Sequence, residues 1–375
     1  MTGADGVSVA DRQQVAAPPA PPTPAHTRQP KRWTRSLVSV AVLAAVFGLA
    51  IPLLADYDDA WAAIVDLHPL AVMVISLAVA WNLYTYWPVL TAALPGLRMS
   101  EAMVVQQAST AVANTVPAGG AVGMAVTFRM LRAWGFTTQA ITRQLVGINM
   151  ASVLVKLLMP VTALALLAGT GEVGGTYLGL AVLGVVAAVG LTIATAFALR
   201  DTHTARRAGA SLDRLVARLG RHRHGVPRQR IAPWLLELRD ELITLARQDG
   251  LRLIFLTVVS HTSLFIVLLV TLRAMGVSEA DLDWAVVFAV FAFVRLLSAL
   301  PITPGGSGIV ELGYVGLLTT EAPGGLASQI TAAVLLFRAL TFVLPIGLGS
   351  LAWLTFHSAT SWRTEPDSRG QLAHA

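Results

Sequence analysis

The sequence contains neither cysteine nor a nucleotide-binding loop. The absence of cysteine excludes disulfide bonds, iron–sulfur clusters and thiolate zinc sites. The eight histidines are scattered, and the closest pair, His222 and His224, lies in an arginine-rich segment where solvation is the natural state. Without a G-x-x-x-x-G-K-S/T motif, the chain does not hydrolyse nucleotides by that route. We therefore expect no metal, no cofactor and no enzymatic activity, and any transport to be passive, ion-coupled or driven by a partner.

Charge is also scarce. Charged residues make up 13% of the chain, against about 25% in soluble domains, while 55% of residues are hydrophobic and the mean hydropathy is +0.66. The apolar residues form blocks that are long enough for the roughly 20 residues needed to cross a hydrocarbon core. The sequence therefore predicts an all-α polytopic membrane protein with about six full spans, at 36–54, 69–93, 141–168, 175–199, 251–275 and 327–357.

The charged residues that do occur indicate an orientation. Segment 200–252 holds twelve arginines against six acidic residues, an excess that equals the net charge of +6. Basic loops beside spans mark the cytoplasmic face and attract anionic lipids, so this excess does not point to nucleic acid. Segments 56–68 and 276–283 carry acids and no lysine or arginine, which places them outside. We expect a multi-pass inner-membrane protein with both termini in the cytoplasm.

Two further apolar stretches, 100–134 and 284–320, are interrupted at their centres by proline and glycine. Proline removes a backbone donor and clashes with the preceding helical turn, and an interrupted helix is not tolerated in lipid unless protein or a cavity surrounds it. Each stretch is therefore predicted to form a re-entrant helix–break–helix hairpin. The residues at the two breaks are candidates for substrate binding: Asn114, Pro117, Gly119, Gly120, Pro301, Thr303, Pro304, Gly305, Gly306 and Gly308.

The spacing of these breaks indicates an internal repeat. The glycine pairs lie 186 residues apart, and Pro160 and Pro345, in the spans that follow, lie 185 apart. The first copy, about 69–168, begins outside and the second, about 251–357, begins inside, so the repeat is inverted. Secondary transporters place the substrate site at such corresponding interruptions. The predicted regions are a disordered cytoplasmic tail at 1–35, a transmembrane domain at 36–357 with a basic cytoplasmic loop at 200–250, and a cytoplasmic tail at 358–375.

Residues 301–318 resemble the lysylphosphatidylglycerol synthase transmembrane region, a family that includes stand-alone flippase-like proteins. The segment around 337–345 resembles the family's last-span motif, and 114–123 resembles the first hairpin of some members. The resemblance covers about 36–355. Its most specific matching positions are Pro301, Thr303, Pro304, Gly305, Gly306, Gly308 and Glu311.

The resemblance implies that the chain translocates lipid. The family's best-known activity, the addition of lysine to phosphatidylglycerol, belongs to a separate cytosolic domain. Only 18 residues follow position 357, too few for such a domain. We therefore expect a stand-alone member that contains the translocation half, with its substrate left open.

Four charged residues lie within apolar stretches: Lys156, Arg295, Glu311 and Arg338. A charge at that depth costs a few kcal/mol, so it should face protein or water. We expect Lys156 and Arg338 to line one cavity. Neither has a matching acid nearby in the sequence, which favours binding of an anionic ligand over a role in helix packing. Arg295 is predicted either to clamp a phosphate, which suits its planar fork, or to pair with Glu311. Glu311 is interpreted either as a helix-start acid that neutralises Arg295 or Arg338, or as a proton carrier.

Other polar positions are given structural interpretations. His261 is expected to form an interhelical hydrogen bond. Arg129 and Arg132 are expected to anchor the first hairpin on the cytoplasmic side. Segments 212–219 and 234–245 have apolar residues at helical spacing. They predict either basic amphipathic helices on the inner leaflet or a soluble helical pair that touches the membrane domain.

The sequence supports three functional hypotheses. The first is translocation of an anionic phospholipid or polyprenyl-phosphate-type amphiphile, with membrane lipids as the partners. The second is secondary transport of a small soluble anion. The third is a non-transporting subunit that docks an envelope-synthesis enzyme, and homo-oligomerisation is compatible with any of them.

Overall fold

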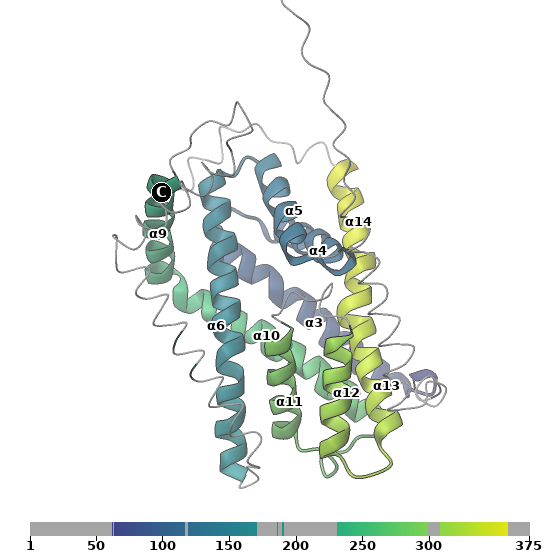
Figure 1. Ribbon diagram of the computed structural model, residues 1–375. Helices are drawn as coiled ribbons and strands as arrows, with labels where there is room; N and C mark the ends of the chain where they lie inside the picture. Colours follow the sequence, from purple (N-terminus) through teal and green to yellow (C-terminus); the bar gives the residue numbers. More distant parts are fainter. Residues whose placement is uncertain are drawn as a thin grey trace, which may run out of the picture.

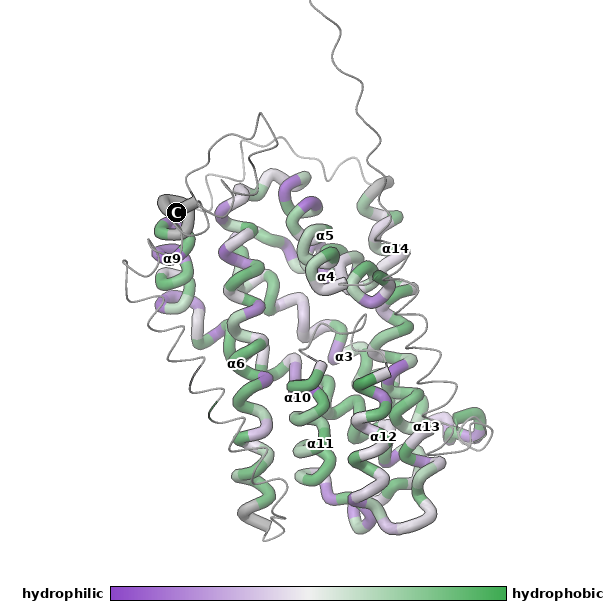
Figure 2. The backbone as a smooth tube through the Cα atoms, viewed as in Figure 1, coloured by the Kyte–Doolittle hydropathy of each residue, from purple (hydrophilic) through white to green (hydrophobic). Residues whose placement is uncertain are grey.

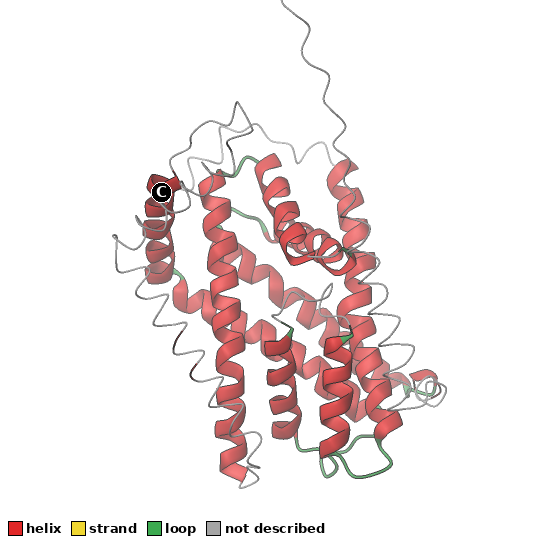
Figure 3. Ribbon diagram, viewed as in Figure 1, coloured by secondary structure: helices red, strands yellow, loops and turns green. Residues whose placement is uncertain are grey.

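The computed structural model describes residues 62, 64–116, 119–170, 186, 190, 231–298 and 308–358. Every regular element in these ranges is a helix (Figure 3). In the first half the helices are α3 (Pro69–Ala93), α4 (Met99–Thr115), α5 (Gly119–Ala133) and α6 (Thr138–Thr170). In the second half they are α9 (Ile231–Gln248), α10 (Gly250–Ala274), α11 (Trp284–Leu297), α12 (Ile309–Glu321), α13 (Ala327–Arg338), the π-helix η4 (Ala339–Val343) and α14 (Leu344–Ser358).

Four helical segments are long and apolar enough to cross a membrane. They are Pro69–Ala93, Thr138–Leu167, Gly250–Ala274 and Ala327–Phe356, and they coincide with four of the six predicted spans. The other two predicted spans, 36–54 and 175–199, lie outside the described residues. The structure therefore confirms an all-helical polytopic protein within its described part.

Both interrupted stretches form pairs of short helices. Helices α4 and α5 are separated between Thr115 and Gly119, and α11 and α12 are separated between Leu297 and Ile309. Figure 1 shows α4 and α5 in the upper half of the bundle, where α6 begins, and α11 and α12 in the lower half, where α6 ends. The two pairs thus lie at opposite ends of the longest helix.

The helices of the two halves pack in a reciprocal pattern. Helix α3 packs against α10, while α4 packs against α14 and α11 packs against α6. Helices α6 and α14 therefore each contact the first arm of the other half's broken pair. The α14–α4 contact is especially close, because a Cβ atom at Gly349 would lie 2.1 Å from the carbonyl oxygen of Gln107.

The largest apolar core lies among α10, α11, α12 and α13, where Figure 2 shows mostly hydrophobic positions. Aromatic rings follow one another through it. The ring of Phe291 lies 5.6 Å from that of Phe265 and 6.3 Å from that of Tyr314, which lies 5.7 Å from that of Phe337. These contacts hold Tyr314 on α12 in a fixed position at 1% exposure.

Helix α9 contains the predicted amphipathic segment 234–245. It packs against α6 and α10, and its Leu245 is buried in a small core with Val89, Ala151 and Leu253. For this segment the structure favours a helix that contacts the membrane domain over one that rests on the leaflet alone. The other predicted segment, 212–219, lies outside the described residues.

Candidate substrate-binding cavity

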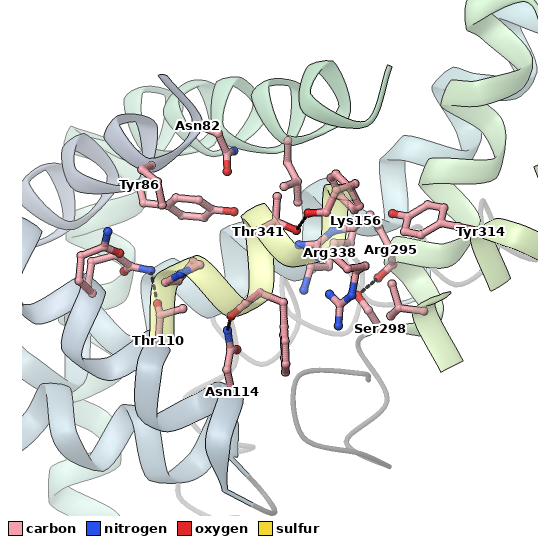
Figure 4. Close-up of a pocket in the computed structure, with 18 residues that line it drawn as sticks. Asn82, Tyr86, Thr110, Asn114, Lys156, Arg295, Ser298, Tyr314, Arg338 and Thr341 are labelled. Atoms are coloured by element: carbon pink, nitrogen blue, oxygen red, sulfur yellow. Dashed lines mark hydrogen bonds between the residues drawn. The ribbon is translucent and has the colours of Figure 1, made fainter. Parts of the chain in front are cut away.

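A cavity of about 290 Å³ lies where the two broken pairs approach each other. Its walls come from α3, α4, α6, α10, α11, α12 and α13, together with η4 and the first turn of α14. Four of the predicted site residues line it: Asn114, Lys156, Arg295 and Arg338 (Figure 4). Segments far apart in the sequence thus supply one polar site inside an apolar bundle.

Glu311 joins two parts of the site by using both of its carboxylate oxygens. Arg338 Nε donates to Glu311 Oε1 at 2.6 Å, and the backbone N–H of Gly308 donates to Glu311 Oε2 at 2.6 Å. The second bond caps the start of α12, where the helix dipole also favours an acid. Glu311 therefore neutralises Arg338, one of the two partners predicted for it, and the alternative Arg295–Glu311 pair does not form. Arg338 has no acid close to it in the sequence, and its partner comes from 27 residues away.

Lys156 and Arg295 have no acidic partner within 4.0 Å among the described residues. Lys156 and Arg295 line the same cavity, and like charges repel each other. Partly buried charges without a counter-ion are unfavourable. In the described part of the chain, the cavity thus brings together three cations and one carboxylate, which favours an anionic ligand.

Three buried donor atoms at the cavity lack a hydrogen-bond partner in the described structure. They are Nε of Arg295, Nη2 of Arg338 and the hydroxyl of Tyr314. Buried polar groups are normally satisfied, so a cluster of unsatisfied donors calls for an explanation. All three residues line the same cavity, so the unsatisfied donors lie next to the space that a ligand would fill.

The π-helix η4 brings the tip of the first broken pair against the last helix. Pro345 has no N–H to bond to the preceding turn, and π-helical turns accommodate such local breaks. Asn114, at the end of α4, donates from Nδ2 to the carbonyl oxygen of Phe342 at 3.0 Å. The guanidinium of Arg338 lies 4.5 Å from the centre of the Phe342 ring. Asn114 is thus a positioning residue for the helix that carries Arg338.

A second wall of the cavity consists of neutral polar side chains that the sequence analysis did not identify. They come from α3 and α4: Asn82, Tyr86, Gln106, Gln107 and Thr110. Asn82 Nδ2 donates to Ser263 Oγ at 2.8 Å and so joins α3 to α10. The amide side chains inside apolar segments could have identified this wall from the sequence, because polar residues at that depth face protein or water.

The predicted break residues are described only in part. A Cβ atom at Gly119 would lie 1.8 Å from the carbonyl oxygen of Ala113, so only glycine fits this close turn. Gly120 has open space around it, and Gly308 adopts a φ of +88°, which favours glycine. The remaining predicted residues lie outside the described residues: Pro117, Pro301, Thr303, Pro304, Gly305 and Gly306.

His261 does not form the expected interhelical hydrogen bond. Its Nδ1 lies 2.9 Å from the carbonyl oxygen of Thr257, one turn earlier in the same helix. A carbonyl oxygen accepts, so Nδ1 carries the proton. The Thr257 carbonyl competes successfully with acceptors on other helices, because it is always within reach of the imidazole.

Among the described residues, no group of three or more His, Asp or Glu side chains is placed to hold a metal ion.

Comparison with known proteins identifies a family. The family described as the lysylphosphatidylglycerol synthase TM region matches residues 36–349. No match was found among curated proteins. The family match includes α3 to α6 and α9 to η4, which supply nearly all of the cavity wall. Because it spans most of the 375 residues, the chain belongs to the family of the lysylphosphatidylglycerol synthase transmembrane region, as the resemblance of residues 301–318 predicted.

Proposed function

We propose that the protein translocates an anionic lipid across the inner membrane, without an enzymatic reaction of its own. One observation carries the proposal. Three cations from three helices, Lys156, Arg295 and Arg338, line one cavity within an apolar bundle, against a single carboxylate. Membership of a family associated with a phospholipid supports lipid handling. The phosphate of a lipid headgroup would supply the missing counter-charge.

An inverted repeat is the architecture that we propose for this transport. The reciprocal packing of α4 on α14 and of α11 on α6 supports it, as do the opposite ends at which the two broken pairs lie (Figure 1). In such proteins the substrate site lies between the repeats, and relative movement of the repeats exposes it to each side in turn. The cavity lies at this boundary, with cations supplied by both halves.

The charges at the two ends of the bundle support the proposed orientation. Arg98 and Arg132 flank the α4–α5 pair, whereas Glu279, Asp281 and Glu321 flank the α11–α12 pair. By the positive-inside rule, the first end faces the cytoplasm. The termini, both proposed to be cytoplasmic, lie outside the described residues.

The size of the cavity supports binding of a lipid headgroup without its acyl chains. Pockets that bury a whole small molecule measure about 300–1,000 Å³, and this one, at about 290 Å³, is near the lower end. We propose that the headgroup enters it while the acyl chains remain in the bilayer. Glu311 bonds both Arg338 and Gly308, which supports a structural role for this acid over proton transfer.

Reconstitution tests the proposal. The full-length protein is placed in vesicles that contain a trace of phosphatidylglycerol labelled with NBD at an acyl chain, and external dithionite then reduces accessible label. In protein-free vesicles only the outer-leaflet label is lost. We expect the wild type to expose inner-leaflet label as well, and Arg295→Met to slow this exchange. Exchange no faster than in protein-free vesicles would contradict lipid translocation.

The same vesicles separate the alternative hypotheses. Uptake of a radiolabelled small anion, without exchange of labelled lipid, would support the secondary transporter. Neither activity, together with capture of an envelope-synthesis enzyme, would support the docking subunit. Dithionite entry is excluded by a soluble NBD compound trapped in the lumen, whose fluorescence must persist.

A further inference from the structure

The cavity has two walls of different chemistry. Figure 4 shows Lys156, Arg295 and Arg338 gathered toward one side, and Tyr86, Thr110 and Asn114 toward the other. The first group comes from α6, α11 and α13, while Tyr86 lies on α3 and the other two on α4. A ligand that fills the cavity therefore meets charge at one end and neutral polar groups at the other.

The charged wall has the donors that a phosphate group requires. Nε of Arg295 and Nη2 of Arg338 are buried and have no partner in the described structure. The Tyr314 hydroxyl, on a side chain that is 1% exposed, is equally unpartnered and lines the same cavity. Charge-assisted bonds from guanidinium to phosphate are short and strong. Because Lys156, Arg295 and Arg338 all line the cavity, this wall fits an anionic phosphate ester.

The same wall does not suit an amine. Glu311, the carboxylate at this site, already accepts from Arg338 and from the Gly308 N–H. Lys156 and Arg295 have no acid within 4.0 Å in the described ranges. A headgroup ammonium would therefore enter a site with surplus positive charge and no free carboxylate to pair with.

The neutral wall suits hydroxyl groups. Asn82 and Asn114 each commit an amide NH₂ to a neighbour, Ser263 Oγ and the Phe342 carbonyl respectively. Their amide oxygens accept no hydrogen bond from described residues and are left as acceptors. Gln106 Nε2 donates to Thr110 Oγ1 at 3.1 Å, which leaves the Gln106 oxygen as a further acceptor. Acceptors of this kind pair with hydroxyl donors.

From these two walls we infer that the ligand is the phosphate ester of an uncharged polyol, such as glycerol or a sugar, and carries no amine. This inference rests on the proposed function and specifies its substrate class. The phosphate binds Arg295, Arg338 and Tyr314, while the polyol hydroxyls bind the amides and hydroxyls of α3 and α4. A phosphate ester of a polyol occurs both in lipid headgroups and in soluble polyol phosphates, and the experiment below distinguishes these two sources.

Binding to the full-length protein in detergent tests the inference. Three short-chain lipids with identical acyl chains are compared: phosphatidylglycerol, phosphatidylmethanol, which has the same charge but no polyol, and phosphatidylethanolamine, which has an amine. Because two or so lost hydrogen bonds correspond to roughly tenfold in Kd, we expect phosphatidylglycerol to bind about tenfold more tightly than phosphatidylmethanol. Phosphatidylethanolamine should bind most weakly.

Variants on each wall assign the preference. Gln106→Leu combined with Thr110→Val should bring the Kd values of phosphatidylglycerol and phosphatidylmethanol together by weakening only the former. Arg295→Met should weaken both equally. Thr142→Val is the matched control and should change neither, because Thr142 is half-buried on α6, bonds its hydroxyl to Thr138 of the same helix and does not line the cavity. A wild type that binds phosphatidylmethanol or phosphatidylethanolamine as tightly as phosphatidylglycerol overturns the polyol inference.

A soluble competitor separates this inference from the proposed function. If sn-glycerol 3-phosphate fails to displace phosphatidylglycerol while the lipid preference holds, both statements stand. If sn-glycerol 3-phosphate binds and no lipid does, the polyol phosphate inference stands and lipid translocation falls. If neither binds, both are overturned.

Discussion

The ion pair between Glu311 and Arg338 makes a quantitative prediction about stability. Glu311 is 2% exposed, and the Arg338 side chain is 13% exposed, so neither charge gains much from water when its partner is removed. Removing one member of a buried pair costs about 3–5 kcal/mol, because the other charge stays buried and unpaired. We therefore expect Glu311→Leu and Arg338→Met each to lower the free energy of unfolding by roughly this amount.

The double variant should be far less affected than the sum of the two. It buries no unpaired charge, and its main loss is the acceptor for the Gly308 N–H, which costs about 1–3 kcal/mol. The two single effects together should thus exceed the double effect by at least about 3 kcal/mol. The control is the more exposed pair between Arg273, in the last turn of α10, and Glu279, in the loop that follows. Its coupling should be about 0–1 kcal/mol.

Unfolding of the purified protein by SDS in mixed micelles, followed by tryptophan fluorescence, measures these differences. Single effects that add up in the double variant would refute the pairing of Glu311 with Arg338. In the Arg273–Glu279 cycle, by contrast, nearly additive single effects are expected. A large coupling in both cycles would show instead that the assay reports net charge.

Three further predictions follow from the same structure. Lys156→Met removes a cation that has no acid partner in the described residues, so SDS titration should show no loss of stability, and a loss would indicate a hidden partner. Gly349→Ala should destabilise the protein by about 1–3 kcal/mol through overpacking against Gln107. Gly347→Ala should not, because nothing lies within 4 Å of the new Cβ atom. Equal effects of the two substitutions would disprove the close α14–α4 contact. Topology reporters at positions 62, 172, 279 and 322 should map outside and those at 205–245 inside, and an inside result at 322 would contradict the inverted arrangement.

Much of the fold could be predicted because it depends on local physics. Block length and hydropathy located α3, α6, α10 and α13–α14 to within a few residues, since each must cross about the same thickness of hydrocarbon. The glycine and proline clusters located both broken pairs, because interrupted helices carry unsatisfied backbone groups. Lys156 and Arg338 were predicted to share one cavity from their depth in apolar segments, and the structure adds Arg295 to the same cavity.

The partners of those charges could not be predicted, because they depend on how distant helices pack. Glu311 lies 16 residues from Arg295 and 27 from Arg338, and nothing in the spacing favours the second over the first. The neutral wall was missed for a similar reason. Tyr86 and Gln106 become cavity residues only because α3 and α4 meet the other half of the chain, and Asn114 reaches Phe342 only because η4 replaces a regular turn.

The central claim is that one cavity is reached from both faces of the membrane through two oppositely placed hairpins. The cysteine-free chain allows this claim to be measured with single cysteines at Lys156→Cys and Thr110→Cys, and at Ser278→Cys as a one-sided control. A membrane-impermeant thiol reagent is applied to either side of oriented vesicles. We predict that both cavity cysteines react from both sides and that Ser278→Cys reacts from outside only. Cavity cysteines that react from one side alone, with or without phosphatidylglycerol present, would contradict the account.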